Sequence, residues 1–487
     1  MPEPFKQISF NEVRACFQQI WGYADFRPPQ GEIIRSLLSG KDALIIMPTG
    51  GGKSICFQLP ALLQTGLTLV VSPLVALMEN QVQELRDRYL LAATLHSQIP
   101  TFQRRQTLQL VQQNQLRLLY LSPETLLSPP VWEILSQPQV NINGLILDEA
   151  HCLVQWGDTF RPAYRRLGTV RPALLKLKPP GSKMAVAAFT ATADPQAQKT
   201  IQTVLQLQKP DTFLLNPYRP NLHLKIQTTW TPRGHRKQLL NYIKQRPEQP
   251  GLIYTRTRKD SEALADWLEA SGDYETAAYH AGLSPEERRT IEKSWLNGEL
   301  PFVICTSAFG MGINKSNVRW VVHFQAPLLL SEYIQEVGRA GRDGKPAEAL
   351  TFVSEPTGWL DPSDRQRWQF FEEQTRSQYQ KAQKLIQKLP VKGEVEAVSR
   401  QFPDGAIALS ILHSSNQLKW LDPFHYTIQK SAQTHSAEKL NRSATEQMRQ
   451  YLTHPHCRWQ FLLQAFGFKE EADSMRCGHC DRCQKRS

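Results

Sequence analysis

The sequence contains no apolar run that approaches the roughly 18 residues a helix needs to cross a bilayer. Its N-terminus, "MPEPFKQISFNEV", also lacks the basic and then apolar pattern of a signal peptide. These absences argue against a membrane or secreted protein. We expect a cytoplasmic protein, associated with the nucleoid if its source is bacterial, with no membrane partner.

An acidic surplus is missing as well. The 57 Lys and Arg residues outnumber the 45 Asp and Glu residues, and the formal net charge is +12. A cationic excess of this size favours a polyanionic partner. Nucleic acid is the simplest candidate.

Cysteine is scarce outside the C-terminus. Four cysteines stand alone in apolar or motif surroundings and are interpreted as buried, reduced thiols: Cys16, Cys56, Cys152 and Cys305. The other four crowd the last 31 residues: Cys457, Cys477, Cys480 and Cys483. Four thiolates, three of them at Cys-x-x-Cys spacing, suit tetrahedral zinc, with a disulfide pair or an iron–sulfur cluster as alternatives.

The 487 residues suggest about three domains. Short apolar runs such as "ALIIM", "LTLVVS" and "INGLILD" alternate with longer polar-periodic segments, and the pattern repeats with "GLIYT", "PFVICTS" and "VRWVVHF". Alternation of this kind predicts parallel sheets covered by helices, with ligand sites at the carboxyl ends of the strands. We therefore predict an α/β fold with two parallel-sheet lobes in tandem.

Beyond about residue 356 the chain becomes polar and helical. Residues 390–430 fit two helices and a hairpin, which suits a small winged-helix-like unit or a plain helical insertion. The predicted boundaries are 1–208 and 209–355 for the lobes, 356–389 for a helical segment, 390–435 for the insertion and 436–487 for the zinc-binding module.

A candidate phosphate site follows the first strand in "ALIIMPTGGGKSICF". Glycines let backbone N–H groups converge on a phosphate at a helix N-terminus, where Lys53 meets the β and γ oxygens and Ser54 ligates Mg²⁺. Met47 occupies the first glycine position of the strict GxxxxGK[ST] string, so a glycine-rich surface loop is the alternative. Asp148 after the strand "GLILD" supplies a second metal-site carboxylate, and Glu149 is placed to orient or deprotonate water.

Five strings occur in the order and at the separations of superfamily 2 helicases: "MPTGGGKS", "DEAH", "AFTATA", "TSAFGMGINKSNVRWVVHF" and "YIQEVGRAGRDG". The sequence resembles RecQ DNA helicases over about residues 20–355 and again over 450–483. The resemblance implies two RecA-like lobes followed by a mainly helical zinc-binding C-terminal module. It also implies ATP and Mg²⁺ as cofactors, structural Zn²⁺, and 3′ to 5′ translocation on single-stranded DNA with duplex unwinding, in repair or recombination.

The resemblance assigns roles to residues of the first lobe. Gln30 and Arg27 correspond to the adenine-reading segment, and the phosphate loop contributes Thr49, Gly50, Gly52, Lys53 and Ser54. "VVSPLVALMENQV" and "LLYLSPETLL" resemble loops that touch the DNA backbone. Thr190 and Thr192 resemble the element that links hydrolysis to lobe movement.

The stretch "HCLVQWGDTFRPAY" resembles the aromatic-rich loop that couples DNA binding to hydrolysis in the family. Trp156, Phe160 and Tyr164 are expected to stack on bases, and Arg161 is expected to contact phosphate. The family usually has Gly-His-Asp ahead of Phe-Arg-Pro, whereas this chain has Gly157-Asp158-Thr159, and Ala163 replaces a usual Glu. We expect these departures to loosen the coupling between DNA binding and hydrolysis or to retune the DNA dependence.

In the second lobe, "YIQEVGRAGRDG" contains Gln335, Arg339 and Arg342, with the two arginines expected on one face of a helical turn. Arg342 is the predicted arginine finger, and Arg339 and Gln335 are predicted to position the γ-phosphate. Thr255, Arg256 and His280 are weaker candidates for contacts with backbone phosphate.

The family commonly continues past its zinc module into a winged helix with a strand-separating hairpin, whereas here "CDRC" is followed by "QKRS". We therefore hypothesise that the 390–430 segment does some of this work through Lys419, Trp420, His425 and Tyr426. Single-stranded and forked DNA are the expected partners, and a single-strand-binding protein is a candidate. Two other functions stay open, an RNA helicase of the DEAD-box kind and a DNA-stimulated ATPase acting in annealing.

Overall fold

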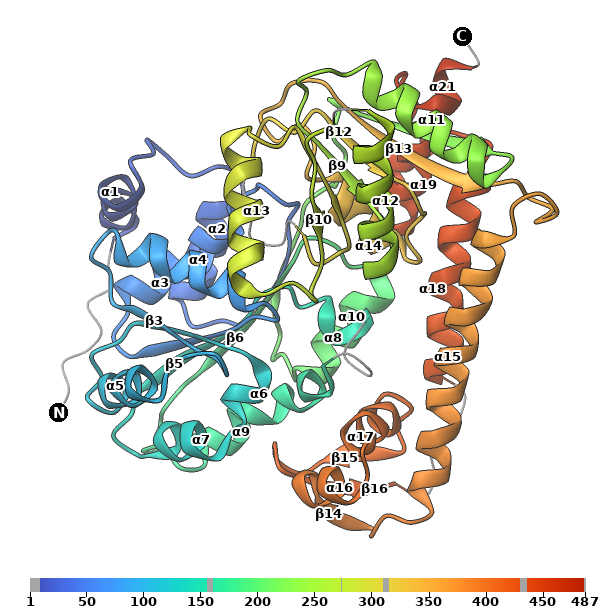
Figure 1. The fold of residues 1–487 in the computed structure, drawn as a ribbon. Coiled ribbons are helices and arrows are strands. Elements are labelled where there is room, and N and C mark those ends of the chain that lie inside the picture. The colour runs from blue at the N-terminus through green and yellow to red at the C-terminus, as the bar shows by residue number, and fades with distance from the viewer. Residues whose placement is uncertain (1–8, 156–160, 273, 310–314, 430–435, 486–487) are drawn as a thin grey trace. The chain divides into compact units, whose positions relative to one another are not determined.

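The structure is a computed structural model that describes residues 9–155, 161–272, 274–309, 315–429 and 436–485 (Figure 1). Contacts group the chain into two units, neither of which is a single stretch of sequence. The first unit comprises residues 1–215 and 379–437, and the second comprises residues 216–378 and 438–487. Among the described helices, none combines the length and the apolar character needed to span a membrane.

The first unit is built on a parallel sheet of seven strands in the order β3-β4-β2-β5-β6-β1-β7. Its strands are β1 Ala43–Ile46, β2 Leu67–Val71, β3 Ala92–Leu95, β4 Leu118–Leu121, β5 Ile142–Leu147, β6 Ala185–Thr190 and β7 Asp211–Leu214. Alternate residues of these strands enter two different cores, one on each face of the sheet. This two-sided burial explains why the strands are nearly continuous apolar runs.

Helices cover both faces of this sheet. They are α1 Phe10–Trp21, α2 Gln30–Leu38, α3 Lys53–Leu63, α4 Val75–Arg86, α5 Thr101–Gln112, α6 Pro123–Leu126, α7 Pro129–Ser136, α8 Cys152–Gln155, the 3₁₀ helix η1 Pro162–Thr169, α9 Val170–Leu175 and α10 Pro195–Val204. Strand β7 lies beyond residue 208, where the sequence places the end of the first lobe. It pairs with β1 and therefore completes the first sheet.

The second unit contains a parallel sheet of six strands in the order β10-β11-β9-β12-β13-β8. Its strands are β8 Leu222–Thr229, β9 Gly251–Tyr254, β10 Ala278–Tyr279, β11 Phe302–Cys305, β12 Trp320–His323 and β13 Ala347–Ser354. Its helices are α11 Pro232–Lys244, α12 Arg258–Ser271, α13 Pro285–Asn297 and α14 Leu330–Val337. The two sheets confirm the prediction of two α/β lobes.

The C-terminal helices belong to the second unit. They are α18 Ser436–Thr453, α19 Arg458–Ala465, α20 Lys469–Asp473 and α21 Asp481–Gln484. In Figure 1 α18 runs beside the long helix α15, Ser363–Ile386, and Arg449 of α18 forms an ion pair with Glu372 of α15 at 2.9 Å.

Between α15 and α18 lies a small module with its own antiparallel sheet, in the order β14-β16-β15. Its elements are β14 Lys392–Glu394, α16 Val395–Gln401, α17 Gly405–Ser414, β15 Leu418–Trp420 and β16 His425–Ile428. Preceded by the end of α15, they follow the winged-helix order of helix, strand, helix, helix, strand, strand. We call residues 379–429 the inserted module.

Candidate ATP site and metal centre

The phosphate loop connects β1 to α3. Gly50 and Gly52 have φ values of 83° and 79°, a left-handed conformation that favours glycine. A Cβ atom on Gly52 would lie 2.3 Å from the Nε2 atom of Gln30. Helix α3 begins at Lys53, so its free N–H groups face the loop, as an anion site requires.

The amide of Gln30 is bonded to this loop. Its Nε2 atom donates to the carbonyl of Gly51 at 3.0 Å, and its Oε1 atom accepts from the backbone N–H of Arg27 at 2.9 Å. The structure therefore brings Arg27 and Gln30 next to the phosphate loop, where the sequence placed a base-reading segment.

The loop lysine lies beside the acidic motif. The Nζ atom of Lys53 is 3.8 Å from Oε1 of Glu149, and the other carboxylate oxygen is 3.2 Å from Nδ1 of His151. Nδ1 of His151 also lies 3.1 Å from Oγ1 of Thr190, which donates to the carbonyl of Thr192 at 3.1 Å. One polar chain thus connects the phosphate loop, the end of β5 and the end of β6.

Lys53 Nζ is buried and has no hydrogen-bond acceptor among the described residues, although it faces Glu149. A buried ammonium group in this position fits an incoming triphosphate, because an anion would supply the missing acceptors. The residues present therefore suit ATP.

Asp148 directly follows β5 and is 4% exposed. Burial and the charge of Glu149 outweigh the opposing effect of Lys53 and raise the pKa of its carboxyl to about 6. A bound divalent cation would stabilise two neighbouring carboxylates, so this site and Ser54 at the start of α3 suit Mg²⁺.

Two residues of this site were not among the predicted catalytic residues. His151 carries the contact between Glu149 and Thr190, and the side chain of Gln81 on α4 lowers the pKa of Asp148. His151 was visible as the last letter of "DEAH". Gln81 had no sequence signal beyond its place after a strand-end loop.

The aromatic-rich loop is described only from Arg161 onward, and Trp156 and Phe160 lie outside the described residues, as do Gly157, Asp158 and Thr159. Nη1 of Arg161 pairs with Oε2 of Glu124 at 2.8 Å, and Nη2 donates to the carbonyl of Pro73 at 2.5 Å. Tyr164 is fully buried in the core of the lobe. The expectation that Tyr164 stacks on bases is therefore wrong in this conformation.

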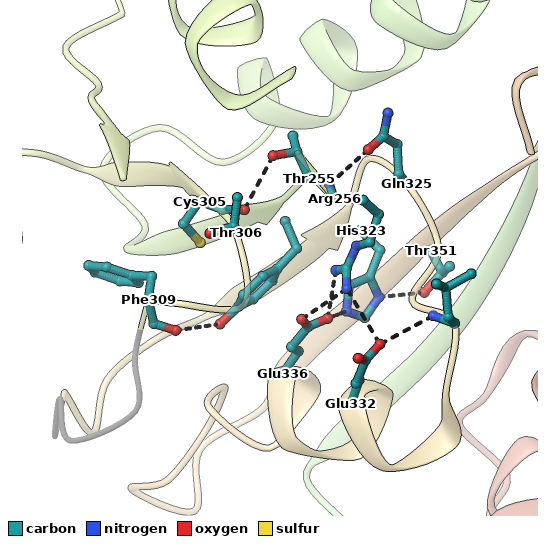
Figure 2. A network of polar contacts seen from close by, with 12 residues as sticks. Thr255, Arg256, Cys305, Thr306, Phe309, His323, Gln325, Glu332, Glu336 and Thr351 are labelled. Carbon is teal, nitrogen blue, oxygen red and sulfur yellow. Dashed lines mark hydrogen bonds and ion pairs between the residues drawn. The ribbon is translucent and has the colours of Figure 1, made fainter. Parts of the chain in front are cut away.

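The second lobe contains a buried ionic network at the carboxyl ends of its strands (Figure 2). Arg256 follows β9 and pairs with Glu336 of α14 at 2.8 Å, and Nε2 of His323 lies 3.0 Å from the same carboxylate. The guanidinium of Arg256 also lies 3.9 Å from the carboxylate of Glu332, so it is paired with two carboxylates of α14. The interpretation of Arg256 as a phosphate contact is therefore not supported, and it anchors α14 instead.

The network shifts the pKa values of its members. Burial raises the pKa of Glu336, but Arg256 and His323 outweigh burial and bring it to about 2. Burial lowers the pKa of His323. The ion pair with Arg256 therefore keeps Glu336 charged inside the lobe.

Helix α14 carries Gln335 and leads into the segment with the two arginines. The helix ends at Val337, so Arg339 and Arg342 lie in a series of turns rather than on a helix. Arg219 donates to the carbonyls of Ala340 and Gly341, which fixes these turns. His280 pairs with Glu262 at 2.8 Å, and Thr255 is fully buried, so both are engaged within the lobe.

The four C-terminal cysteines converge. Their Sγ atoms all lie within 4.8 Å of one another, and those of Cys477 and Cys483 are 3.9 Å apart. Tetrahedral zinc with Zn–S distances near 2.3 Å requires sulfur atoms separated by roughly 3.8 Å, so the cluster fits zinc. The ring of His479 lies against Tyr218 and His223, away from a ligand role.

Three family comparisons cover this chain in sequence order. The DEAD/DEAH box helicase domain matches residues 27–201, the helicase conserved C-terminal domain matches 234–344, and the RecQ zinc-binding domain matches 421–484. An ATP-dependent DNA helicase RecQ from Synechocystis is 53% identical over 472 residues, covering 97% of this chain and 98% of the relative. The chain belongs to the RecQ helicase family.

Other RecQ relatives are longer than the matched region. RecQ of Pasteurella multocida is 38% identical over 73% of this chain and 54% of its own length. The probable ATP-dependent DNA helicase RecS of Bacillus subtilis is 38% identical over 70% of this chain and 66% of its own length. The predictions of a RecQ-type, ATP-hydrolysing helicase with a zinc-binding domain are confirmed.

Solved helicases share the fold of this RecQ chain. DUF1998 helicase MrfA bound to DNA superposes with a TM-score of 0.60 over 88% of this chain and 64% of its own, at 18% identity. Yeast Dbp5 bound to RNA and ADP BeF3 superposes with a TM-score of 0.57 over 74% of this chain and 93% of its own, at 16% identity. The prediction of two RecA-like lobes is therefore confirmed.

Proposed function

We propose that this RecQ-family protein uses ATP hydrolysis to translocate 3′ to 5′ on single-stranded DNA and to unwind duplex DNA, in repair or recombination. The observation that carries the proposal is the buried polar chain from Lys53 through Glu149 and His151 to Thr190. This series of polar contacts supplies a cation for the triphosphate and a carboxylate for the attacking water. It also connects both groups to the end of β6.

Each predicted site residue takes a role in this proposal. Lys53 binds the β and γ phosphates and Glu149 orients the attacking water. Ser54 and Asp148 would hold Mg²⁺, which would supply positive charge to stabilise the transferred phosphoryl group. Thr49, Gly50 and Gly52 shape the phosphate cradle, and Arg27 and Gln30 form the base-side wall. Gln335, Arg339 and Arg342 are the second lobe's contribution to the γ-phosphate. Cys457, Cys477, Cys480 and Cys483 would hold Zn²⁺.

Single-stranded and forked DNA are the proposed substrates, supported by the net charge of +12. Trp156 and Phe160 are proposed to stack on bases, and Arg161 to lie at the DNA-facing edge of the first lobe. A single-strand-binding protein is a candidate partner, and we propose a cytoplasmic, nucleoid-associated location if the source is bacterial.

A forked-duplex unwinding assay tests the proposal. Wild-type protein should separate the strands only with ATP and Mg²⁺, whereas Lys53→Ala should lose about 10²-fold or more of the rate. The matched control is Lys41→Ala, because Lys41 is exposed and forms only a surface ion pair with Asp211. Wild-type protein that hydrolyses ATP with DNA but only anneals strands would overturn the unwinding proposal, and stronger stimulation by RNA would overturn the DNA assignment.

A further inference from the structure

Helix α17 of the inserted module is buried on every side. The five consecutive residues Ala408 to Leu412 are all buried, and at 100° per residue they cover the whole helix circumference. The module's own core accounts for Ala408, Leu409, Ile411 and Leu412. A helix of ten residues in so small a module needs a second surface to cover its outer side.

The first lobe provides that surface. Helix α17 packs against η1, and Nη1 of Arg166 in η1 donates to the carbonyl of Pro423 at 3.0 Å. The ring of Phe424 meets Trp132 of α7 edge to face, with ring centroids 5.1 Å apart. Phe424 also packs against the core cluster of the first lobe.

The charges at this contact are compatible with docking. Burial and, to a smaller extent, the charge of Arg165 in η1 lower the pKa of His413 at the end of α17 to about 3. His413 is therefore neutral at physiological pH and does not repel Arg165.

This contact uses the surfaces with which helix-turn-helix and winged-helix folds usually approach DNA. The second helix of the pair, α17, lies on η1, and the turn between β15 and β16 lies on α7. Trp420 and Tyr426 are 5% and 0% exposed, in the module core. The hypothesis that these two aromatic residues separate DNA strands is therefore wrong in this arrangement, although Lys419 and His425 are exposed.

The docked surface is continuous with the candidate DNA contacts of the lobe. Arg161 directly precedes η1, and its guanidinium holds the carbonyl of Pro73 after β2 and the carboxylate of Glu124 in α6. These two segments carry the strings that resemble backbone-contacting loops. A contact that holds η1 in place also holds Arg161 in place, because the two are adjacent in the sequence. Arg161 in turn connects the two segments.

We propose that the inserted module is an internal brace for DNA activation of the ATPase. Phe424 against α7 and Pro423 against η1 act as positioning residues that hold this part of the first lobe and, through η1, Arg161. This inference rests on the proposed DNA-dependent ATP hydrolysis. The module is tethered by α15 and by the segment leading to α18, so it acts at high effective concentration on η1 without tight intrinsic binding.

The test compares full-length Phe424→Ala, Phe424→Leu and Lys419→Ala with wild type. The readouts are basal ATPase activity, KM for ATP, and the concentration of single-stranded DNA that gives half-maximal stimulation. Phe424→Ala should raise that DNA concentration about 3- to 10-fold, the range expected when one partly buried aromatic contact is lost. Basal kcat and KM should stay within about twofold, because Phe424 touches no nucleotide-site residue described above.

Phe424→Leu should recover most of the DNA response, since a large apolar side chain still covers α7, and Lys419→Ala should match wild type. The double variant Trp132→Ala/Phe424→Ala should be no worse than the more affected single variant, because both remove one contact. Additive single effects, an unchanged DNA response in Phe424→Ala, or an equal loss of basal activity would each overturn the inference. Wild-type protein without any DNA stimulation would instead overturn the proposed function.

Discussion

The two small modules that follow the second lobe are attached in opposite ways. The zinc module shares one hydrophobic cluster with the second lobe, and Trp459 donates its indole N–H to the carbonyl of Leu222 in β8 at 3.2 Å. The inserted module keeps a separate cluster and touches the first lobe through a docking surface.

The difference follows from what each module must cover. Strand β8 is an edge strand, and the zinc module covers it, with the carboxylate of Asp481 accepting from the N–H of Ile226 at 3.4 Å. The inserted module satisfies its strands within its own sheet. One module therefore shares the core of a lobe, and the other has a core of its own and packs against a lobe.

Removing a predicted zinc ligand should have the largest effect on the stability of the second unit. Cys480→Ser breaks the thiolate set, and structural zinc contributes about 10–16 kcal/mol to folding in small zinc domains. We expect loss of bound zinc by elemental analysis and a lower midpoint of unfolding for the second unit in urea. Cys16→Ser on α1 is the control and should retain the metal. Full stability of Cys480→Ser without zinc would contradict the assignment.

The next largest effect should come from the buried tryptophan. Trp459→Ala removes a side chain that is 1% exposed, and such truncations cost about 3–5 kcal/mol. Urea unfolding should show the loss in the second unit. Trp359→Ala is the matched control, because Trp359 is 89% exposed and should change stability by less than about 0.5 kcal/mol. Equal effects of the two substitutions would mean that the zinc module is not integrated with the lobe.

Truncation of a core side chain in the inserted module should unfold this module without unfolding the two lobes. Leu409→Ala removes a fully buried side chain from α17, at a local cost of about 2–5 kcal/mol. Hydrogen exchange measured by mass spectrometry should accelerate in residues 392–428 and stay unchanged in the zinc module and both central sheets. Arg400→Ala, at an exposed position, is the control. Acceleration throughout the first lobe would show that module and lobe form one cooperative unit.

Acid should have the smallest effect, and the ionic network of the second unit should contribute on the order of 2 kcal/mol to it. The lowered pKa of His323 favours its neutral form, so stability falls as pH drops below about 6.5, where the unfolded histidine gains a proton. Glu336, with a folded pKa of about 2, contributes stability above about pH 4.3, and this is lost as pH falls toward 2. Urea unfolding followed against pH measures both phases. Glu336→Gln should abolish the lower phase, and persistence of that phase would assign it to another carboxyl.

Several features were predictable because neighbouring residues determine them. The phosphate loop and Asp148 each follow an apolar strand, and the spacing of the cysteines predicts a common ligand set. Arg256 was misinterpreted because a cation at a strand end looks the same whether it faces phosphate or a buried carboxylate. Its partner Glu336 lies 80 residues away in the sequence, and only the packing of α14 against the strand ends brings the two together.

The sequence alone determined the two parallel sheets, the family, the glycine-rich loop and the cysteine cluster, because each depends on a local pattern of apolar, glycine or cysteine residues. Tertiary structure decided that β7 completes the first sheet, that Tyr164 is a core residue and that Arg256 anchors α14. It also decided that residues 379–429 pack against η1 while the zinc module joins the second lobe. These outcomes depend on which apolar surfaces meet, and no short stretch of sequence records the partner of a surface.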